Sequence, residues 1–167
     1  MIYVVLYLGA VILANLIVAR YGPASTIPVG FLFIGLDLTA RDHLHDAWHG
    51  EGLAWKMAVL IATGSLFTWL INRNAGPIAV ASFVAFASAA TVDALVYHYL
   101  RRYPRWLRIN GSNVPSAAVD SIVFQIVAFG GFPWVTILGQ FLAKTLGGFL
   151  WSLLFRRLDR AALVGAE

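Results

Sequence analysis

Residues 35–50, GLDLTARDHLHDAWHG, hold three of the four histidines and three of the eight acidic residues of this 167-residue chain. If the second half of this segment is helical, Asp42, His45, Asp46 and His49 fall at i, i+3, i+4 and i+7 and share one face. Two histidines one turn apart beside two carboxylates have the spacing of a divalent-metal site. The same pattern also fits a pH-sensitive gate, because histidine titrates near neutral pH.

A metal site finds little support elsewhere in the sequence. The segment does not match the HExxH pattern of zinc-dependent proteases, and the chain contains no cysteine that would supply a thiolate ligand. Asp37 and Arg41 are spaced to pair at i, i+4, and Trp48 is a typical anchor at a membrane surface. We therefore interpret the four polar residues as a candidate gate where a helix leaves the bilayer, and we assign no metal or other cofactor.

A second group of polar residues lies inside the apolar segments. Four are ionisable and three are amides: Asp37, Asp93, Asp120, Lys144, Asn15, Gln125 and Gln140. An ionisable side chain within a membrane-spanning helix costs about 2.5 to 3.5 kcal/mol on insertion scales, so each one needs a partner, water or a function. Counting from the predicted span ends, we expect Asp93 and Asp120 at similar depths, about 10 Å inside the membrane edge, with Lys144 nearer the middle.

Helical spacing places several of these residues on common faces. In the last apolar segment, a polar residue or glycine recurs at every fourth position, at Thr136, Gln140, Lys144 and Gly148. In the preceding segment, Asp120, Phe124 and Gln125 fall within a sector about 140° wide. Both faces are expected to point into the bundle. A structural Asp120–Lys144 ion pair with amides that hold helices together is the alternative, but seven interior polar residues favour ligand binding or transport.

The composition explains where these residues must sit. The chain is 60% hydrophobic and 12% charged, and its mean hydropathy of +0.77 is far above that of ordinary soluble domains. We predict a single all-α, polytopic membrane domain over residues 1–167, with spans at 2–19, 27–40, 53–71, 78–100, 114–130 and 133–155. The second span is short and is expected to be tilted, partial or re-entrant. The basic stretch 101–108 is expected to be a loop.

Loop charges predict the orientation of these six spans. One side carries nine basic residues, namely Arg41, Lys56, Arg101, Arg102, Arg105, Arg108, Arg156, Arg157 and Arg160. The other side carries only Arg20 and Arg73. Because basic residues stay on the cytoplasmic side, both termini are predicted to be cytoplasmic in a bacterial-type inner membrane. A nucleic-acid partner is not expected, since no aromatic stacking platform accompanies the basic stretch.

The sequence says less about the energy source for transport and about partner proteins than about the fold. The chain lacks the GxxxxGK[ST] motif, so transport would be facilitated, coupled to an ion gradient, or driven by separate subunits. Ala10 and Ala14 form a small-xxx-small pair, which favours ordinary helix packing and is otherwise a candidate docking face for a coupling subunit or a second copy of the chain. The first apolar run lacks the basic start and cleavage site of a secretory signal, so we expect it to be a retained span.

Four stretches of the sequence together carry a family resemblance. They are Asn15 followed by Arg20; Asp42, Asp46, Trp48 and Gly50; Asp93 with the basic stretch, WLRINGS at 106–112, Asp120, Phe124, Ala128 and Phe129; and Lys144. In this order and spacing, the chain resembles the vitamin uptake transporter family, whose best-known members import queuosine precursors such as 7-cyano-7-deazaguanine. It differs from typical members in its shorter ends and in Asp46, where a glutamate is usual. The resemblance implies a six-helix bundle similar to the substrate-binding subunits of energy-coupling vitamin transporters.

The resemblance also implies roles for the polar residues. A deazaguanine presents two adjacent N–H donors, which Asp93 or Asp120 would accept, and a carbonyl and nitrile that need donors. Candidate donors are Lys144, Gln125, Gln140 and Asn15, while Asp37 is a candidate for the transport pathway. Candidate stacking residues are Phe124, Phe129, Trp134 and Trp151.

Three hypotheses of function follow from the sequence. The first is a non-enzymatic importer of a queuosine precursor, with a small heterocycle and the lipid bilayer as its partners. The second is a substrate-binding subunit that needs separate energising subunits. The third is an intramembrane metal-dependent enzyme that uses His45 and His49.

Overall fold

The computed structural model describes residues 2–48 and 52–164, and every regular element in this part of the chain is helical. The main helices are α1 (Ile2–Tyr21), α2 (Thr26–Val29), α3 (Gly35–Ala47), α4 (Leu53–Ile71), α5 (Gly76–Tyr99), α6 (Arg105–Phe129) and α7 (Trp134–Val164). A π-helical segment, η2 (Gly30–Ile34), joins α2 directly to α3. The short 3-10 turns are η1 (Pro23–Ser25), η3 (Arg73–Ala75) and η4 (Leu100–Arg102). Since α2, η2 and α3 form one continuous rod, the predicted six-helix bundle is confirmed.

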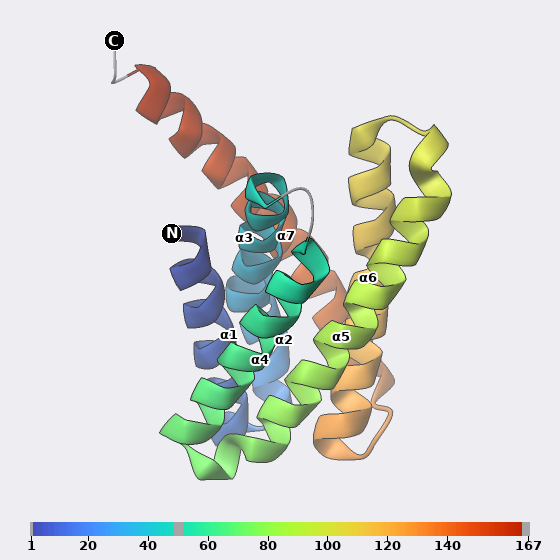
Figure 1. Cartoon of the computed structure of the whole chain (residues 1–167). Coiled ribbons are helices and arrows are strands. Elements are labelled where there is room, and N and C mark those ends of the chain that lie inside the picture. Colours follow the sequence, from blue (N-terminus) through green and yellow to red (C-terminus); the bar gives the residue numbers. More distant parts are fainter. Residues whose placement is uncertain (1, 49–51, 165–167) are drawn as a thin grey trace.

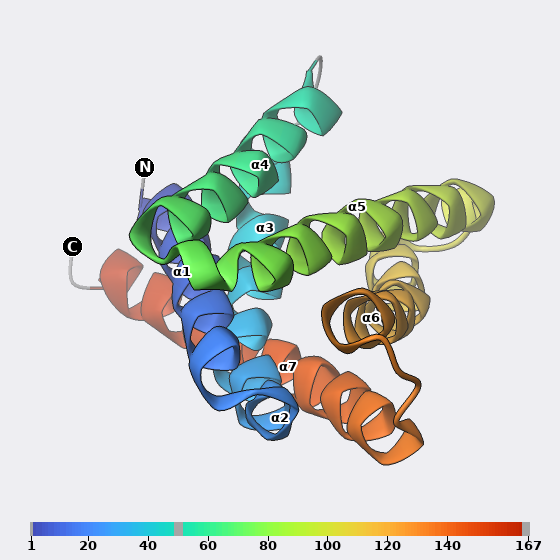
Figure 2. The same cartoon turned by 90° about the horizontal axis from the view of Figure 1, so that it is seen from below.

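The helices run alternately up and down, and both termini lie at the same end of the bundle (Figure 1). We refer to this as the termini end, and to the other as the hairpin end, where η1, η3 and the turn after α6 lie. Contacts link α1 to α4, α4 to α5, α5 to α6, α6 to α7, and α7 to α3, which packs on α1. The helices therefore close into a ring, and Figure 2 shows α6 between α5 and α7.

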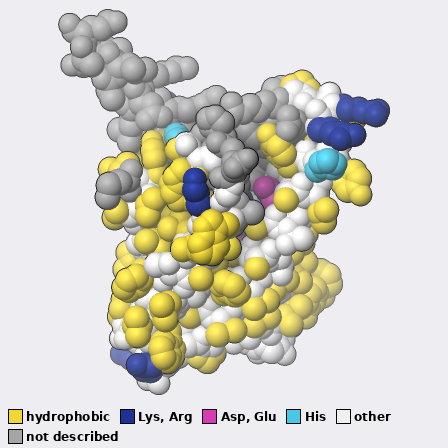
Figure 3. Space-filling model, in the orientation of Figure 1, with side chains coloured by type: hydrophobic (Ala, Val, Ile, Leu, Met, Phe, Trp, Pro, Cys, Tyr) yellow, Lys and Arg dark blue, Asp and Glu magenta, His cyan; other side chains and the backbone are white. Residues whose placement is uncertain are grey.

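The outer surface of the bundle is largely apolar. Within the described residues, five helical stretches are long and apolar enough to cross a membrane: Ile2–Tyr21, Pro23–Arg41, Arg73–Arg102, Gly111–Phe129 and Trp134–Phe155. The shorter apolar helix Trp55–Ile71 accompanies them. Figure 3 shows hydrophobic side chains over much of one face, with the lysines and arginines gathered towards its two ends. This distribution fits a multi-pass membrane protein.

Two helices extend beyond the predicted spans. The second rod is apolar over Pro23–Arg41, a longer stretch than the predicted span 27–40, and it continues as a helix through Ala47. The prediction of a loop over residues 101–108 is wrong from Arg105 onwards, where α6 begins directly after the extended residue Pro104. Pro115, which resembles a helix start in the sequence, lies inside α6. A proline removes one backbone hydrogen bond, and the surrounding helices tolerate this in a membrane bundle.

The early start of α6 corrects the expected depths of two carboxylates. Asp120 lies fifteen residues after Arg105, which corresponds to about 22 Å along α6 from the termini end. Asp93 lies six residues before Tyr99, which corresponds to about 9 Å along α5 from the same end. The two carboxylates therefore do not share a depth, and Asp120 lies much closer to the middle of the bundle.

Glycines bring the second rod and α7 into very close contact. A Cβ atom at Gly147 would lie 2.1 Å from the carbonyl oxygen of Phe31, and one at Gly35 would lie 2.5 Å from the backbone of Gly147. The indole Nε1 of Trp151 donates a 2.9 Å hydrogen bond to the carbonyl oxygen of Leu32, within η2. A π-helical turn disturbs the regular backbone ladder, and here a side chain from α7 satisfies one of its carbonyls.

The small-xxx-small pair of α1 does not form an outer docking face. Ala10 and Ala14 are both buried inside the bundle, and α1 packs against α4 there. Gly64 of α4 approaches α1 closely enough that an added Cβ would lie 3.2 Å from Cγ1 of Val11. The pair therefore serves helix packing within one chain, as the favoured interpretation predicted, and the alternative of a docking face is wrong.

Replacing Gly147 with alanine tests the close contact between α3 and α7. The added methyl group would collide with backbone atoms of η2, and overpacking of this kind costs about 1–3 kcal/mol. Gly147→Ala should therefore lower the melting temperature of the purified protein. Gly9→Ala is the matched control, because nothing lies within 4 Å of its Cβ position and alanine favours a helix. Equal melting temperatures for the two variants would contradict the close contact.

Candidate functional site

A cavity lies inside the bundle, with walls from five of the main helices and from η2. Its empty space is about 330 Å³ when the open mouth is included, but only about 20 Å³ is open to water-sized molecules. The lining residues are Ala14, Asn15, Val18, Thr26, Val29, Ile34, Ser82, Phe86, Asp120, Phe124, Gln140 and Lys144. In this conformation the cavity admits water-sized molecules, and its walls must separate to admit a bicyclic ligand.

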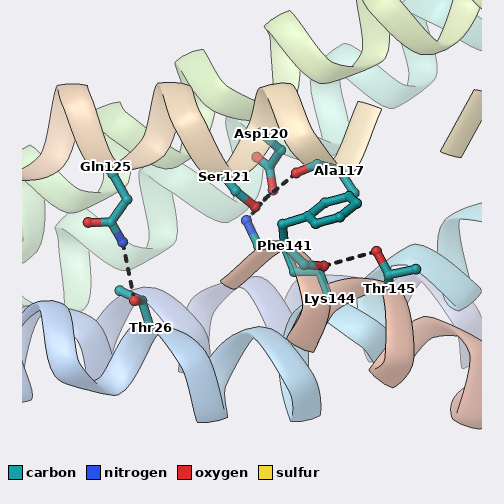
Figure 4. Close-up of polar contacts among 8 residues, drawn as sticks. All are labelled: Thr26, Ala117, Asp120, Ser121, Gln125, Phe141, Lys144 and Thr145. Carbon is teal, nitrogen blue, oxygen red and sulfur yellow. Dashed lines mark hydrogen bonds and ion pairs between the residues drawn. The ribbon is translucent and has the colours of Figure 1, made fainter. Parts of the chain in front are cut away.

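The strongest polar interaction in the cavity joins α6 to α7. Lys144 Nζ lies 2.5 Å from Asp120 Oδ2, and the two side chains are 3% and 9% exposed (Figure 4). The ammonium also lies 6.0 Å from the centre of the Phe124 ring. Each charge compensates the other in a medium where an isolated ion would be costly. Both charged groups thus sit where a ligand would meet them.

Two buried glutamines present amide oxygens to the interior. Gln125 Nε2 donates to Thr26 Oγ1 at 3.2 Å (Figure 4). The Thr26 hydroxyl in turn donates to the Pro23 carbonyl oxygen at 2.7 Å. Because the Thr26 hydrogen is used in this way, the amide of Gln125 must point its nitrogen towards Thr26. The oxygens Gln125 Oε1 and Gln140 Oε1 are buried without a hydrogen-bond partner in the described part of the chain. Gln140 lines the cavity, so its oxygen is available to a ligand donor.

Asn15 connects the cavity wall to α4. Its Nδ2 atom donates to Thr68 Oγ1 at 3.4 Å, and the Thr68 hydroxyl donates to the carbonyl oxygen of Gly64 at 2.8 Å. The hydroxyl of Thr68 can therefore only accept from Asn15, which fixes the orientation of the amide. Asn15 lines the cavity from α1.

The structure brings together five of the eight residues predicted to bind substrate. Asn15, Asp120, Phe124, Gln140 and Lys144 all line the cavity. The other three lie elsewhere: Gln125 bonds to Thr26, Asp37 is buried on α3, and Asp93 is half-buried on α5. One carboxylate oxygen of Asp93 is buried without a partner among the described residues. Asp120 is thus the carboxylate placed to meet a ligand in this cavity.

Seven of the twelve lining residues were not predicted to bind substrate, namely Ala14, Val18, Thr26, Val29, Ile34, Ser82 and Phe86, and neither predicted tryptophan lines the cavity. Ser82 and Phe86 lie at i and i+4 on α5, and this spacing indicates a common helix face. Thr26 begins the short helix α2 directly after the turn η1, where no such spacing could indicate it. Trp134 is 71% exposed, and Trp151 bonds to the backbone of η2. Of the predicted stacking residues only Phe124 lines the cavity, and Phe129 packs edge-on against it.

No histidine of residues 35–50 is among the described residues that line the cavity. The side chains of Asp42, His45 and Asp46 and the whole of His49 lie outside the described part of the structure, so the gate hypothesis stays a prediction. Among the described residues, no group of three or more His, Cys, Asp or Glu side chains could hold a metal ion. His43 stacks on Tyr3 with ring centres 4.4 Å apart and contacts Phe155 edge-on. This histidine packs α3 between α1 and α7 near the termini end.

Comparison with known proteins finds a matching family. A family model described as "Putative vitamin uptake transporter" matches residues 4–159, which include every residue that lines the cavity. No curated protein and no solved structure gives a significant match.

A double-mutant cycle on the Asp120–Lys144 pair should show strong coupling. Asp120→Asn or Lys144→Met alone leaves one buried charge without its partner, which costs about 3–5 kcal/mol. The double variant removes both charges, so its melting temperature should recover most of the loss of either single variant. Melting temperatures of the four purified proteins measure this coupling. Additive losses in the double variant would show that the pair is not held in a low-dielectric interior.

Proposed function

The chain belongs to the vitamin uptake transporter family, and we propose that it imports a queuosine precursor or a related 7-deazapurine such as 7-cyano-7-deazaguanine. The observation that carries this proposal is the central cavity, where Asp120, Lys144 and Gln140 converge beside Phe124. Apolar walls with a few convergent polar groups are typical of small-molecule sites. The family match and the membrane-helix bundle point to a transporter rather than an enzyme.

The chemistry of a deazaguanine complements the polar groups of this cavity. Its pyrimidine edge carries a carbonyl acceptor next to two N–H donors, which match Lys144 and Asp120 respectively. The amide oxygen of Gln140 is a further acceptor for a ligand N–H group. The rings of Phe124 and Phe86 supply apolar surface for the flat bicyclic base. On binding, Lys144 and Asp120 would separate from each other, and each would form a hydrogen bond with the ligand instead.

We further propose that the termini end faces the cytoplasm of a bacterial-type cell. The exposed Arg101 and Arg102 lie near this end in η4, while Arg73 lies at the hairpin end and packs on the Trp69 ring at 3.7 Å. The excess of basic residues at the termini end supports this orientation through the preference of lysine and arginine for the cytoplasmic side.

Single cysteines test the orientation cleanly, because the chain contains none of its own. Asn74→Cys lies on the exposed surface of η3 and should react with a membrane-impermeant maleimide added to intact spheroplasts. Arg102→Cys is equally exposed in η4 and should react only after the membrane is permeabilised. The reverse labelling pattern would overturn the proposed orientation.

Uptake in cells that cannot make queuosine precursors tests the proposed function. Expression of this chain should restore queuosine in tRNA when 7-cyano-7-deazaguanine is supplied at low external concentration. The host should also lack energising subunits of vitamin transporters, so that rescue shows transport by this chain alone. A well-expressed protein that gives no rescue would contradict the proposal, and rescue only with added energising subunits would favour a substrate-binding subunit.

Two asparagine variants separate the carboxylates in the same assay. Asp120→Asn should reduce uptake by at least about tenfold, since it removes the acceptor for two ligand donors. Because Asp93 lies outside the cavity wall, Asp93→Asn should reduce uptake far less than Asp120→Asn. Equal effects of the two substitutions at matched expression would argue against Asp120 as the ligand-binding carboxylate.

A further inference from the structure

The charges that line the cavity cancel each other. Asp120 and Lys144 are the ionisable residues among the described side chains of its wall, and they form one buried ion pair. The remaining wall is made of amides, hydroxyls and apolar groups. The cavity wall thus carries no net charge, although it contains two full charges at hydrogen-bond distance.

The nearest other buried charges do not change this balance. Asp37 and Arg41 are both buried on α3, one turn apart, and they also carry opposite charges. Asp93 lies towards the termini end of α5, away from the residues that line the cavity. A ligand in the cavity therefore meets a neutral environment whose local field is set by Lys144 and Asp120.

On the basis of the proposed function, we propose that this cavity selects uncharged ligands, and that Lys144 is the residue that rejects cations. A cationic ligand that reached Asp120 would either lie against the Lys144 ammonium or displace it from its only charged partner in the wall. Both arrangements leave an uncompensated positive charge in a medium that cannot solvate it. A neutral ligand with adjacent donors and acceptors keeps both charges satisfied.

The distinction is relevant to 7-deazapurines, because the group at position 7 decides their charge. A nitrile is neutral, whereas an aminomethyl group in its place is a primary amine and, like lysine, is protonated at neutral pH. A hydroxymethyl group has the size and polarity of the aminomethyl group without its charge. These three substituents separate the effect of charge from those of size and hydrogen bonding.

Binding of the three compounds to purified protein tests the inference. The ligands are 7-cyano-, 7-hydroxymethyl- and 7-aminomethyl-7-deazaguanine, and the proteins are wild type, Lys144→Gln and the double variant Asp120→Asn/Lys144→Gln. Wild type should bind the two neutral ligands at least about tenfold more tightly than the aminomethyl compound. Lys144→Gln leaves the Asp120 carboxylate uncompensated and should reverse this preference. The double variant should lose the reversal, because no charge remains in the cavity wall.

The outcomes separate this inference from the proposed function. If wild type binds none of the three compounds, both fail together. If wild type binds all three with similar affinity, or if Lys144→Gln weakens every ligand by the same factor, the proposed function stands and charge selection is overturned. The wild-type ratio of hydroxymethyl to aminomethyl binding needs no variant, so the test remains decisive even if Lys144→Gln does not fold.

Discussion

The buried contact between Lys144 and Asp120 is the constraint on which the interior of this bundle depends. Two ions that are almost fully removed from water are tolerated only when they remain within hydrogen-bond distance of each other. They come from different helices, so α6 and α7 must keep a fixed register and rotation. A small shift of either helix would separate the charges, and the pair therefore ties the shape of the cavity to the packing of the whole ring.

Packing of the second rod against α7 supplies this fixed position. Gly35 and Gly147 allow the two backbones to meet, and Gly30 lies where an added Cβ would be 3.4 Å from Cγ of Lys144. The hydrogen bond from Trp151 to Leu32 holds η2 to the same face of α7. Small residues promote close helix contact within membranes, where the lipid offers no hydrophobic driving force between helices. The glycines thus place the stem of Lys144 beside η2 and its ammonium in the cavity.

Sequence periodicity could predict the parts of the site that lie on one helix. Gln140 and Lys144 recur every fourth residue on α7 and both line the cavity, as does Phe124, four residues after Asp120 on α6. Periodicity could not decide between neighbouring positions on one sector, since Gln125 is rotated by about 100° from Phe124 and contacts Thr26 instead. It also could not show which helices face each other, so Ser82 on α5 and Thr26 on α2 were missed.

The fold was predictable to a greater degree than the site. Hydropathy alone indicated six helices, and the asymmetry of the loop charges supported an even number of spans. The error in α6 came from the basic stretch 101–108, because a run of arginines resembles a loop in a single sequence, although α6 begins at Arg105 within it. The ion pair between Asp120 and Lys144 was nevertheless foreseen as an alternative, because two opposite charges inside apolar segments need partners. Ala10 and Ala14 were ambiguous, since small residues pack helices within a chain and between chains alike.

Calorimetric titration with 7-cyano-7-deazaguanine, on the purified wild type and on a variant with a filled cavity, shows whether the ligand binds beside the ion pair. Ser82→Leu would project a larger side chain into the cavity from α5 without replacing either member of the ion pair. We expect one ligand per wild-type chain and loss of binding in the folded variant, whose melting temperature should fall because overpacking of a small cavity costs about 1–3 kcal/mol. Unchanged affinity in a folded Ser82→Leu protein would show that the ligand binds elsewhere.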